Sequence, residues 1–143
     1  MGLFSGQRPD NLGVREGKLS PCAAKPNCVA SQADPNDTGH YIAPFVISGP
    51  VAPAWAKLVS VLREQPRAVM VVAESSYLHA EFTSRLMGYV DDVEFVLDEN
   101  NRVIHVRSAS RLGTSDFGVN RKRIEVLRES WRARQAPNVS QSS

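Results

Sequence analysis

The sequence has no long apolar run. Its 143 residues contain no stretch that approaches the ~20 apolar residues a membrane-spanning helix requires. The first residues, Met1 to Pro9, lack the apolar core of a secretory signal, and Gly6 stands where a myristoylation signal has Ser or Thr. From these absences we expect a soluble, cytoplasmic protein with no membrane partner.

Cysteine is scarce, since the chain contains only Cys22 and Cys28. The five residues between them match neither the spacing of a redox pair nor that of a standard zinc site. His40 adds one imidazole, which leaves a metal-ligand set incomplete, so we expect no metal and no cofactor. The favoured interpretation is a proline-stiffened loop with two buried, free thiols. A disulfide that closes this short loop is the alternative, and it would require an oxidising compartment.

Charge is nearly balanced, and the sequence patterns of nucleotide chemistry are missing. The net charge of +2 is too small to indicate nucleic acid unless the cations gather on one face. Phe117 and Trp131, the aromatic neighbours of the basic residues, are assigned to the hydrophobic core, so a nucleic-acid partner is not expected. No P-loop, dinucleotide fingerprint or nucleophile–base pair is present.

Hydrophobic periodicity predicts one α+β domain. Residues 1–40 read as an N-terminal arm packed on the domain, because turn-forming residues recur and no helical period persists. The domain spans residues 41–134, and residues 135–143 are expected to form a disordered tail. The expected elements are a strand (41–47), a helix ending before Pro66, four strands in a meander (68–74, 77–85, 90–97 and 101–109) and a helix (120–134). This order predicts a mainly antiparallel, five-stranded sheet with two helices on one face.

The last hairpin can be placed in register. A two-residue turn at Asn100-Asn101 is acceptable, since Asn tolerates a positive φ. The turn predicts three cross-strand pairs: Leu97 with Ile104, Phe95 with Val106, and Glu94 with Arg107. The buried helix stripes should be Trp55, Leu58, Val59 and Leu62 in the first helix, and Ile124, Leu127 and Trp131 in the second.

The segment from residue 107 to 123 has the densest concentration of polar residues. It leaves a strand, crosses a glycine-containing loop and enters a helix that Asn120 would cap. Three cations in the first helical turn oppose the helix dipole, so a negative partner is expected. That partner is internal, with Asp91, Asp92 and Asp116 as candidates, or it is an external small anion or acidic protein. The candidate ligand-binding residues are Arg107, Ser108, Ser110, Arg111, Ser115, Asp116, Asn120, Arg121 and Arg123.

The polar face of the predicted sheet is a second candidate. Imidazoles and carboxylates on one face can hold a metal or perform acid–base chemistry. An enzyme of this kind would use His79, Glu81, Glu94 and His105. The competing interpretation is an ordinary polar face turned to water, with Glu94 and Arg107 as a cross-strand ion pair. The face carries Tyr77, His79, Glu81, Asp92, Glu94, His105 and Arg107.

Several short runs along the chain together resemble a known family. They are Leu12-Gly-Val14, Pro21-Cys22, Pro26-Asn-Cys-Val29, Ser31-Gln32, Val90-Asp-Asp-Val-Glu-Phe95, Arg107-Ser-Ala-Ser-Arg111, Gly113, Ser115-Asp-Phe-Gly118 and Asn120-Arg-Lys-Arg123. From about Arg8 to Arg132 the chain resembles the bacterial and plastid family catalogued as domain of unknown function 1499, with Ala23 and Ala30 as mild departures. The resemblance implies no particular activity. It implies that the cysteine loop and residues 107–123 are shared features of the family and pack together.

Three functions follow as hypotheses. The first is a non-enzymatic module that binds a small anion or an acidic partner through residues 107–123. The second is a metal- or acid–base-dependent enzyme on the polar sheet face. The third is a purely structural, protein-interaction domain, in which the same arginines, serines and aspartates lock the arm onto the final helix.

Overall fold

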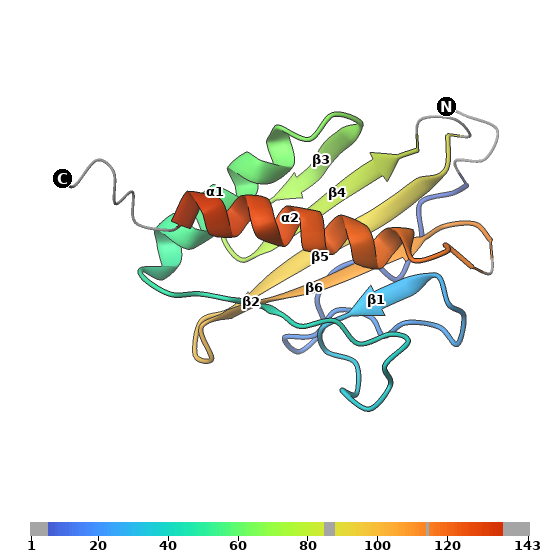
Figure 1. The fold of residues 1–143 in the computed structure, drawn as a ribbon, viewed down its shortest axis with the longest axis horizontal. Helices are drawn as coiled ribbons and strands as arrows, with labels where there is room; N and C mark the ends of the chain where they lie inside the picture. Colours follow the sequence, from blue (N-terminus) through green and yellow to red (C-terminus); the bar gives the residue numbers. More distant parts are fainter. Residues whose placement is uncertain (1–5, 85–87, 114, 136–143) are drawn as a thin grey trace.

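One antiparallel sheet forms the body of the molecule, and both helices lie on one of its faces (Figure 1). The computed structural model describes residues 6–84, 88–113 and 115–135. The spatial order of the strands is β1-β6-β5-β4-β3, and β2 also pairs with β6. The predicted α+β fold is therefore confirmed. The elements are β1 (Cys28–Ala30), β2 (Phe45–Val46), α1 (Val51–Arg63), β3 (Ala68–Ala73), β4 (Tyr77–Thr83), β5 (Val90–Asp98), β6 (Val103–Ser110) and α2 (Val119–Gln135).

Both helices turn an apolar stripe towards the sheet. α1 ends shortly before Pro66, because the proline ring disfavours a helical residue ahead of it. The indole N–H of Trp131 on α2 donates to the carbonyl of Ala54 on α1 at 2.9 Å, which ties the two helices together. The predicted stripe of α2 is confirmed, whereas Val59 of the predicted α1 stripe is only partly buried. The buried residues of α1 are Ala54, Trp55, Leu58, Val61 and Leu62.

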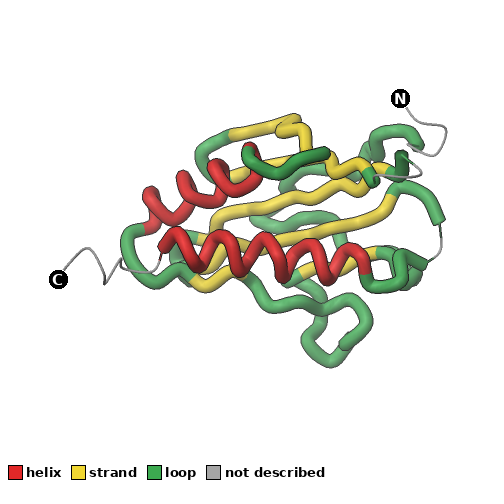
Figure 2. The backbone as a smooth tube through the Cα atoms, turned by 45° about the horizontal axis from the view of Figure 1, so that its top comes forward, coloured by secondary structure: helices red, strands yellow, loops and turns green. Residues whose placement is uncertain are grey.

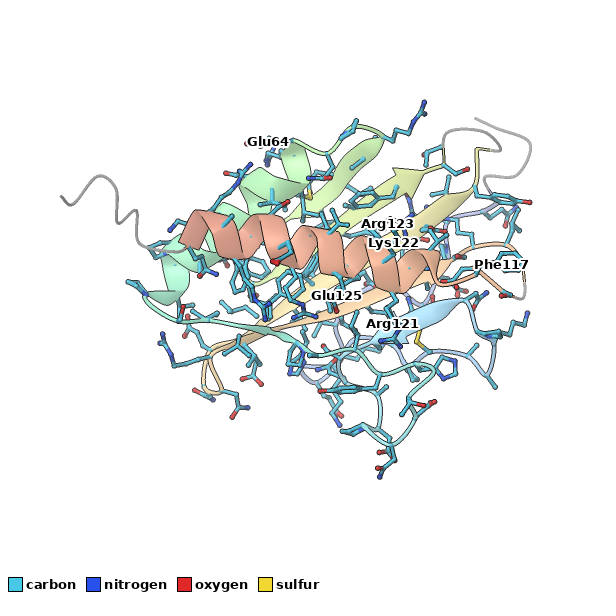
Figure 3. All side chains as sticks on the ribbon, viewed as in Figure 1. Glu64, Phe117, Arg121, Lys122, Arg123 and Glu125 are labelled. Carbon is cyan, nitrogen blue, oxygen red and sulfur yellow. A yellow bond between two sulfur atoms is a disulfide. The ribbon has the colours of Figure 1, made fainter. Side chains whose placement is uncertain are left out.

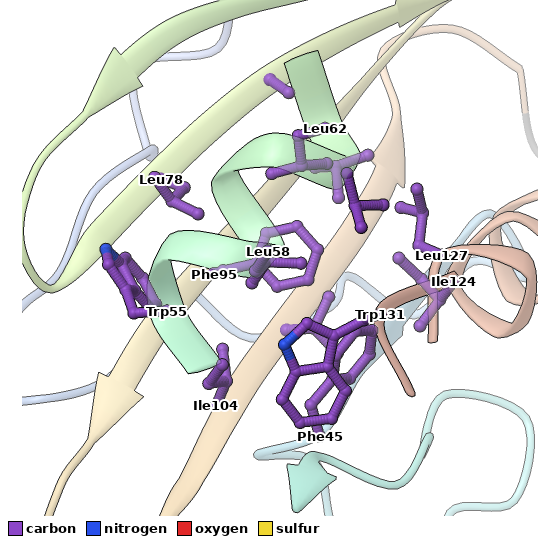
Figure 4. Packing of buried hydrophobic residues seen from close by; sticks show 14 of the residues in the cluster. Phe45, Trp55, Leu58, Leu62, Leu78, Phe95, Ile104, Ile124, Leu127 and Trp131 are labelled. Atoms are coloured by element: carbon purple, nitrogen blue, oxygen red, sulfur yellow. The ribbon is translucent and has the colours of Figure 1, made fainter. Parts of the chain in front are cut away.

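The hydrophobic core lies between these helices and the sheet (Figure 4). Phe45 joins β2 to β5 and α2, with ring centroids 5.6 Å from Phe95 and 5.2 Å from Trp131. Such pairs of buried rings add about 0.5–1.5 kcal/mol each beyond the burial of their area. Leu58 of α1 and Ile104 of β6 are fully buried in the same cluster. The core therefore fixes α1 and α2 against the β5–β6 hairpin.

The β5–β6 hairpin has the register predicted from the sequence. Its pairs include Leu97 with Ile104, Phe95 with Val106 and Glu94 with Arg107. The carboxylate of Asp98 holds the turn, because it accepts hydrogen bonds from the backbone and the side chain of Asn101. Arg102, rather than an asparagine, takes the positive φ of this turn, 55°.

The sheet has six strands, one more than predicted, because the N-terminal arm contributes β1. β1 and β2 share one edge of β6: residues 28–30 pair with residues 107–109, and residues 45–46 pair with residues 103–104. The expected strand 41–47 is reduced to two residues, and Pro44, which has no N–H to donate, precedes it. Three residues are too few for an alternating pattern, which is why β1 escaped the prediction.

Loop segments lie behind the sheet, on the face opposite the helices (Figure 2), and residues 8–13 of the arm are among them. The N–H of Gly13 donates to the carboxylate of Glu94 at 2.8 Å, and Arg8 donates to Glu81 at 2.7 Å. Glu94 alternates with the core residue Phe95, so it points away from the helices. None of the described helices is long and apolar enough to cross a membrane. Residues 136–143 of the predicted tail lie outside the described residues.

The two cysteines are joined, so the expectation of free thiols is wrong. Cys22 and Cys28 form a disulfide, with their Cα atoms 5.6 Å apart. Two tight backbone turns fold the loop back on itself: the N–H of Lys25 donates to the carbonyl of Ala23, and the N–H of Asn27 donates to that of Lys25. The disulfide closes the loop immediately before β1 pairs with β6.

Candidate functional site

The inner side of the segment 107–123 is a hydrogen-bonded network centred on Asn120, which is fully buried. The amide of Asn120 donates to Ser110 at 2.9 Å and to Asp116 at 2.7 Å. It also donates to the carbonyl of Asn27 at 3.2 Å, and its own carbonyl accepts from Ser108. Asn27 belongs to the cysteine loop, so this loop and the segment do pack together, as the resemblance implied.

Asp116, not Asn120, caps α2, so the predicted cap is wrong. The carboxylate of Asp116 accepts from the backbone N–H of Gly118 at 2.8 Å and of Asn120 at 3.1 Å. Burial acts to raise the pKa of Asp116, but hydrogen bonds from Asn120 and Gly118 outweigh it and lower the pKa below its usual value. The negative charge of this carboxylate lies near the positive end of the helix dipole. It therefore offsets the repulsion between that dipole and the three cations in the first helical turn.

Three of the four predicted anion-binding arginines, Arg107, Arg111 and Arg123, are paired with internal carboxylates. Arg123 lies 2.8 Å from Asp91. Arg111 contacts Asp92 at 2.8 Å and also contacts Glu81, and little of its side chain is exposed. An external anion at these guanidinium groups would have to displace a carboxylate of the protein itself.

Arg107 and Glu94 form the cross-strand pair that the hairpin register predicted. The pair is buried beneath the N-terminal arm, not exposed to water. Arg107 Nη1 lies 3.4 Å from Glu94 Oε1, and Glu94 is fully buried. Glu94 also accepts from the hydroxyl of Tyr77 and from the N–H of Gly13. Burial, together with the hydrogen bond to Glu94, raises the pKa of Tyr77. The expectation of a polar face turned to water is therefore wrong here, because the arm covers it.

A group of potential metal ligands lies on this covered face. His79, Glu81 and Asp92 offer atoms within 4.8 Å of one another. The guanidinium of Arg111 donates to both carboxylates, and His79 Nε2 lies 2.8 Å from Asp92 Oδ1. Burial acts to raise the pKa of Asp92, but Arg111 and His79 outweigh it and lower the pKa. Because Arg8 and Arg111 already pair with these two carboxylates, the group does not fit a metal ion.

His105 has different partners, so the residues predicted for an enzyme do not form one site. Its Nδ1 lies 3.0 Å from Ser31 Oγ and its Nε2 lies 3.7 Å from Asp98 Oδ2. Burial lowers the pKa of His105, although Asp98 acts in the opposite direction. The order Ser-His-Asp resembles a hydrolytic triad. Ser31 is buried, however, and its hydroxyl accepts the backbone N–H of Val106 at 2.8 Å, so it is not presented to a substrate.

The outer side of the segment borders an open groove of about 720 Å³. The groove runs between the N-terminal half of α2, the end of β4 and the turn after α1. We call it the α2 groove. Its apolar lining includes Phe82, Val126 and Leu127, and its cationic residues are Arg67, Lys122 and Arg123.

Two of the three cations that line the α2 groove are not balanced by acids. No carboxylate occurs among the described residues that line it. Arg123 is neutralised by Asp91 and lies over the ring of Phe82, 5.1 Å from its centroid. Arg67 and Lys122 are exposed, and neither pairs with a carboxylate in the described part of the chain. Two open positive charges therefore stand beside an apolar surface.

The sequence analysis did not place Arg67 or Lys122 in the site. Lys122 shares a basic run with Arg121 and Arg123, and this run was the available signal. Arg67 is far away in sequence and reaches the groove only through the turn after α1, where it takes a φ of 72°. Of the remaining predicted residues, Arg121 donates to two backbone carbonyls, at residues 38 and 39, rather than to a carboxylate.

Phe117 lies in the loop before α2 and departs most from its prediction (Figure 3). It was assigned to the core together with Trp131. Trp131 is buried, but Phe117 is 93% exposed, so that assignment is wrong. Its φ is 53°, a region that bulky residues rarely adopt. Ser115 accepts the N–H of Phe117 at 3.3 Å, and Asp116 accepts that of Gly118, which together hold the loop in this conformation.

Comparison with protein families agrees with the motifs in the sequence. A family described as "Protein of unknown function (DUF1499)" matches residues 18–130, which is most of the chain. Among curated proteins, none matches. The matched range includes the cysteine loop, the covered polar face and residues 107–123. The chain therefore belongs to the DUF1499 family.

Proposed function

We propose that this protein is a non-enzymatic binding module for a small amphipathic anion, held in the α2 groove. Such a ligand joins a carboxylate or phosphate to an apolar chain. The observation that carries the proposal is the pair of exposed cations, Arg67 and Lys122, beside Phe82 and Val126. Cations at the rim would bind the acid group, and the apolar floor would remove the chain from water.

The proposal assigns different roles to the two sides of the segment 107–123. On the inner side, Arg107 and Arg111 are engaged by Glu94 and Asp92, which supports a structural role for them. On the outer side, Lys122 is open to solvent. An amphipathic anion fits this arrangement better than an inorganic anion or an acidic protein surface, because the open charges border an apolar groove.

The experiment is a titration with decanoate, followed by the backbone amide resonances of the isotope-labelled protein. We expect shifts concentrated on residues of the α2 groove, such as Thr83 and Val126, and none with acetate, which has the charge without the chain. Arg67→Gln and Lys122→Gln should each weaken binding about fivefold, the effect of about 1 kcal/mol for an exposed ion pair. Binding should also weaken with added salt.

The matched control is Lys25→Gln, since Lys25 is an exposed lysine that does not line the groove. Its decanoate affinity should equal that of the wild type. Shifts spread evenly over the surface, or equal affinity in Lys122→Gln and the wild type, would contradict the proposal.

The compartment is a separate prediction. The sequence led us to expect the cytoplasm, but the Cys22–Cys28 disulfide is a bond that persists mainly in oxidising compartments. The disulfide thus favours an oxidising compartment over the cytoplasm. Labelling of thiols in rapidly acid-quenched cells, before and after reduction, tests this. Cysteines that react without prior reduction would return the prediction to the cytoplasm.

A further inference from the structure

We infer that the turn at residues 115–118, immediately before α2, docks onto an anionic membrane surface, with the side chain of Phe117 entering the lipid. The inference rests on the proposed function in one respect, since an anionic lipid would supply the amphipathic ligand. The evidence from Phe117 does not depend on the proposed function. It departs from the expectation of no membrane partner, which rested on spanning segments, secretory signals and lipid attachment alone.

Phe117 has no structural role that its folded position explains. Its side chain is 93% exposed, so it adds nothing to the core. Its positive φ is one that glycine adopts without strain, and Gly118 follows it at a φ of 81°. A turn alone would need glycine or asparagine at position 117 rather than a phenylalanine. A contact outside the protein would remove this ring from water.

The surroundings of Phe117 have the character of an interfacial segment. Leu112 and Val119 are also exposed, and they line the same 450 Å³ hollow as Phe117. Arg121 and Lys122 follow within one helical turn (Figure 3). An apolar tip bordered by cations suits the boundary of an anionic bilayer, where apolar side chains meet acyl chains and cations meet phosphates.

The nearby carboxylates do not cancel this attraction. Asp91 is neutralised by Arg123. Asp116 keeps its negative charge, because it accepts from neutral N–H groups, but the two cations Arg121 and Lys122 outnumber it. Arg121 donates only to backbone carbonyls among its described partners, so it keeps its net charge. The charge of the tip is thus complementary to phosphate headgroups.

A bilayer fits this tip better than a protein pocket does. Phe117 stands out from the loop, and a protein partner would need a preformed cavity to receive it, whereas acyl chains yield to its shape. The hollow beside Phe117 also adjoins the α2 groove, since Val119 and Arg123 line both. A lipid contacted at the tip would therefore lie next to the groove proposed to hold an amphipathic anion.

The experiment is co-sedimentation of the full chain with lipid vesicles. We expect binding to vesicles of phosphatidylcholine and phosphatidylglycerol in equal parts, and none to phosphatidylcholine alone. Phe117→Ala should lower the partition coefficient about tenfold or more, as the loss of a buried aromatic side chain predicts. Lys122→Gln should lower it about fivefold, and added salt should weaken binding further.

Val46→Ala is the control, because Val46 is an exposed apolar residue on β2, at the opposite end of β6 from the loop. It should bind vesicles as the wild type does. Phe117→Trp should retain binding, and its fluorescence should shift to the blue on anionic vesicles when the two native tryptophans are subtracted. Equal binding by Phe117→Ala and the wild type, or no binding to anionic vesicles, would overturn the inference.

A parallel titration with decanoate, without vesicles, separates the two proposals. Phe117→Ala should bind decanoate as the wild type does, because Phe117 does not line the α2 groove. Decanoate binding without vesicle binding overturns the membrane inference alone. Phe117-dependent vesicle binding without decanoate binding supports it and overturns the groove as the ligand site.

Discussion

The inner and outer sides of the segment 107–123 use the same types of residue in opposite ways. On the inner side, Arg111 is enclosed by Asp92 and Glu81, beneath the arm. On the outer side, Lys122 stands exposed, and Arg67 of the turn after α1 lines the same groove; no acid occurs among the described residues of its lining. A buried cation needs a negative partner, because removing an unpaired charge from water costs several kcal/mol. An exposed cation is hydrated, so it is stable without a partner and remains available to a ligand. The comparison teaches that the densest polar run in a sequence can be a structural network on one side and a binding surface on the other.

The largest expected effect comes from breaking the deepest pair. Glu94→Gln leaves the buried guanidinium of Arg107 without its counter-charge, and we expect the free energy of unfolding to fall by about 3–5 kcal/mol. Urea denaturation measures this. Glu64→Gln is the control, since Glu64 pairs with Arg134 on the exposed surface and should have little effect. Comparable losses in the two variants would mean that burial does not distinguish the two pairs.

The next effect concerns the bond that closes the loop before β1. The double variant Cys22→Ser/Cys28→Ser should lose about 2 kcal/mol of stability, the chain-entropy value for a loop this short. The same loss should follow when the wild type is treated with a reducing agent, while the double variant should not respond to it. A reduced wild type with two titratable thiols and unchanged stability would show that the disulfide does not stabilise the fold.

A smaller effect is expected from pH. The pKa of Asp92 is lowered in the folded protein, although burial acts in the opposite direction, because Arg111 and His79 stabilise its charge. A lowered pKa contributes stability that is present above the unfolded value of about 4 and is lost as the pH falls through the folded value. Arg111→Gln should therefore be less stable than the wild type at pH 7, and the two stability curves should converge in acid. Urea denaturation between pH 7 and pH 2 tests this, and parallel curves would contradict it.

The smallest effects on stability belong to the outer side. Lys122→Gln and Phe117→Ala remove exposed side chains that pack against nothing in the core, so each should change the free energy of unfolding by less than about 0.5 kcal/mol. Thermal denaturation followed by circular dichroism measures this. A loss as large as that of Glu94→Gln would place these residues in the structural network instead.

The pattern of apolar and polar residues predicted the fold well in those elements that are long enough to show a clear period. The alternation of β5 and β6 fixed their register, and the stripe of Ile124, Leu127 and Trp131 fixed the buried face of α2. The three residues of β1 carry no such pattern, so the arm's strand was missed. The polar face was expected to meet water because nothing in the arm's composition indicates that Gly13 reaches Glu94.

The site was predicted less well, because pairing is decided by tertiary contacts. Arg111 and Lys122 are both cations in the same polar run of the sequence. Only the fold brings Arg111 to Asp92 and leaves Lys122 exposed to solvent. Phe117 was assigned to the core because aromatic residues are usually buried. The turn at Phe117 is held by hydrogen bonds to Ser115 and Asp116, which a sequence pattern centred on Asn120 did not reveal.

The most direct test of the two-sided account is the melting temperature of the wild type, Arg111→Gln and Lys122→Gln, each with and without decanoate. A ligand that binds only the folded state raises the melting temperature by mass action. We predict that Arg111→Gln melts lower than the wild type but gains the same increment from decanoate, and that Lys122→Gln melts like the wild type but gains less. A decanoate increment that is lost in Arg111→Gln and kept in Lys122→Gln would contradict the account, because it would place the anion on the inner side.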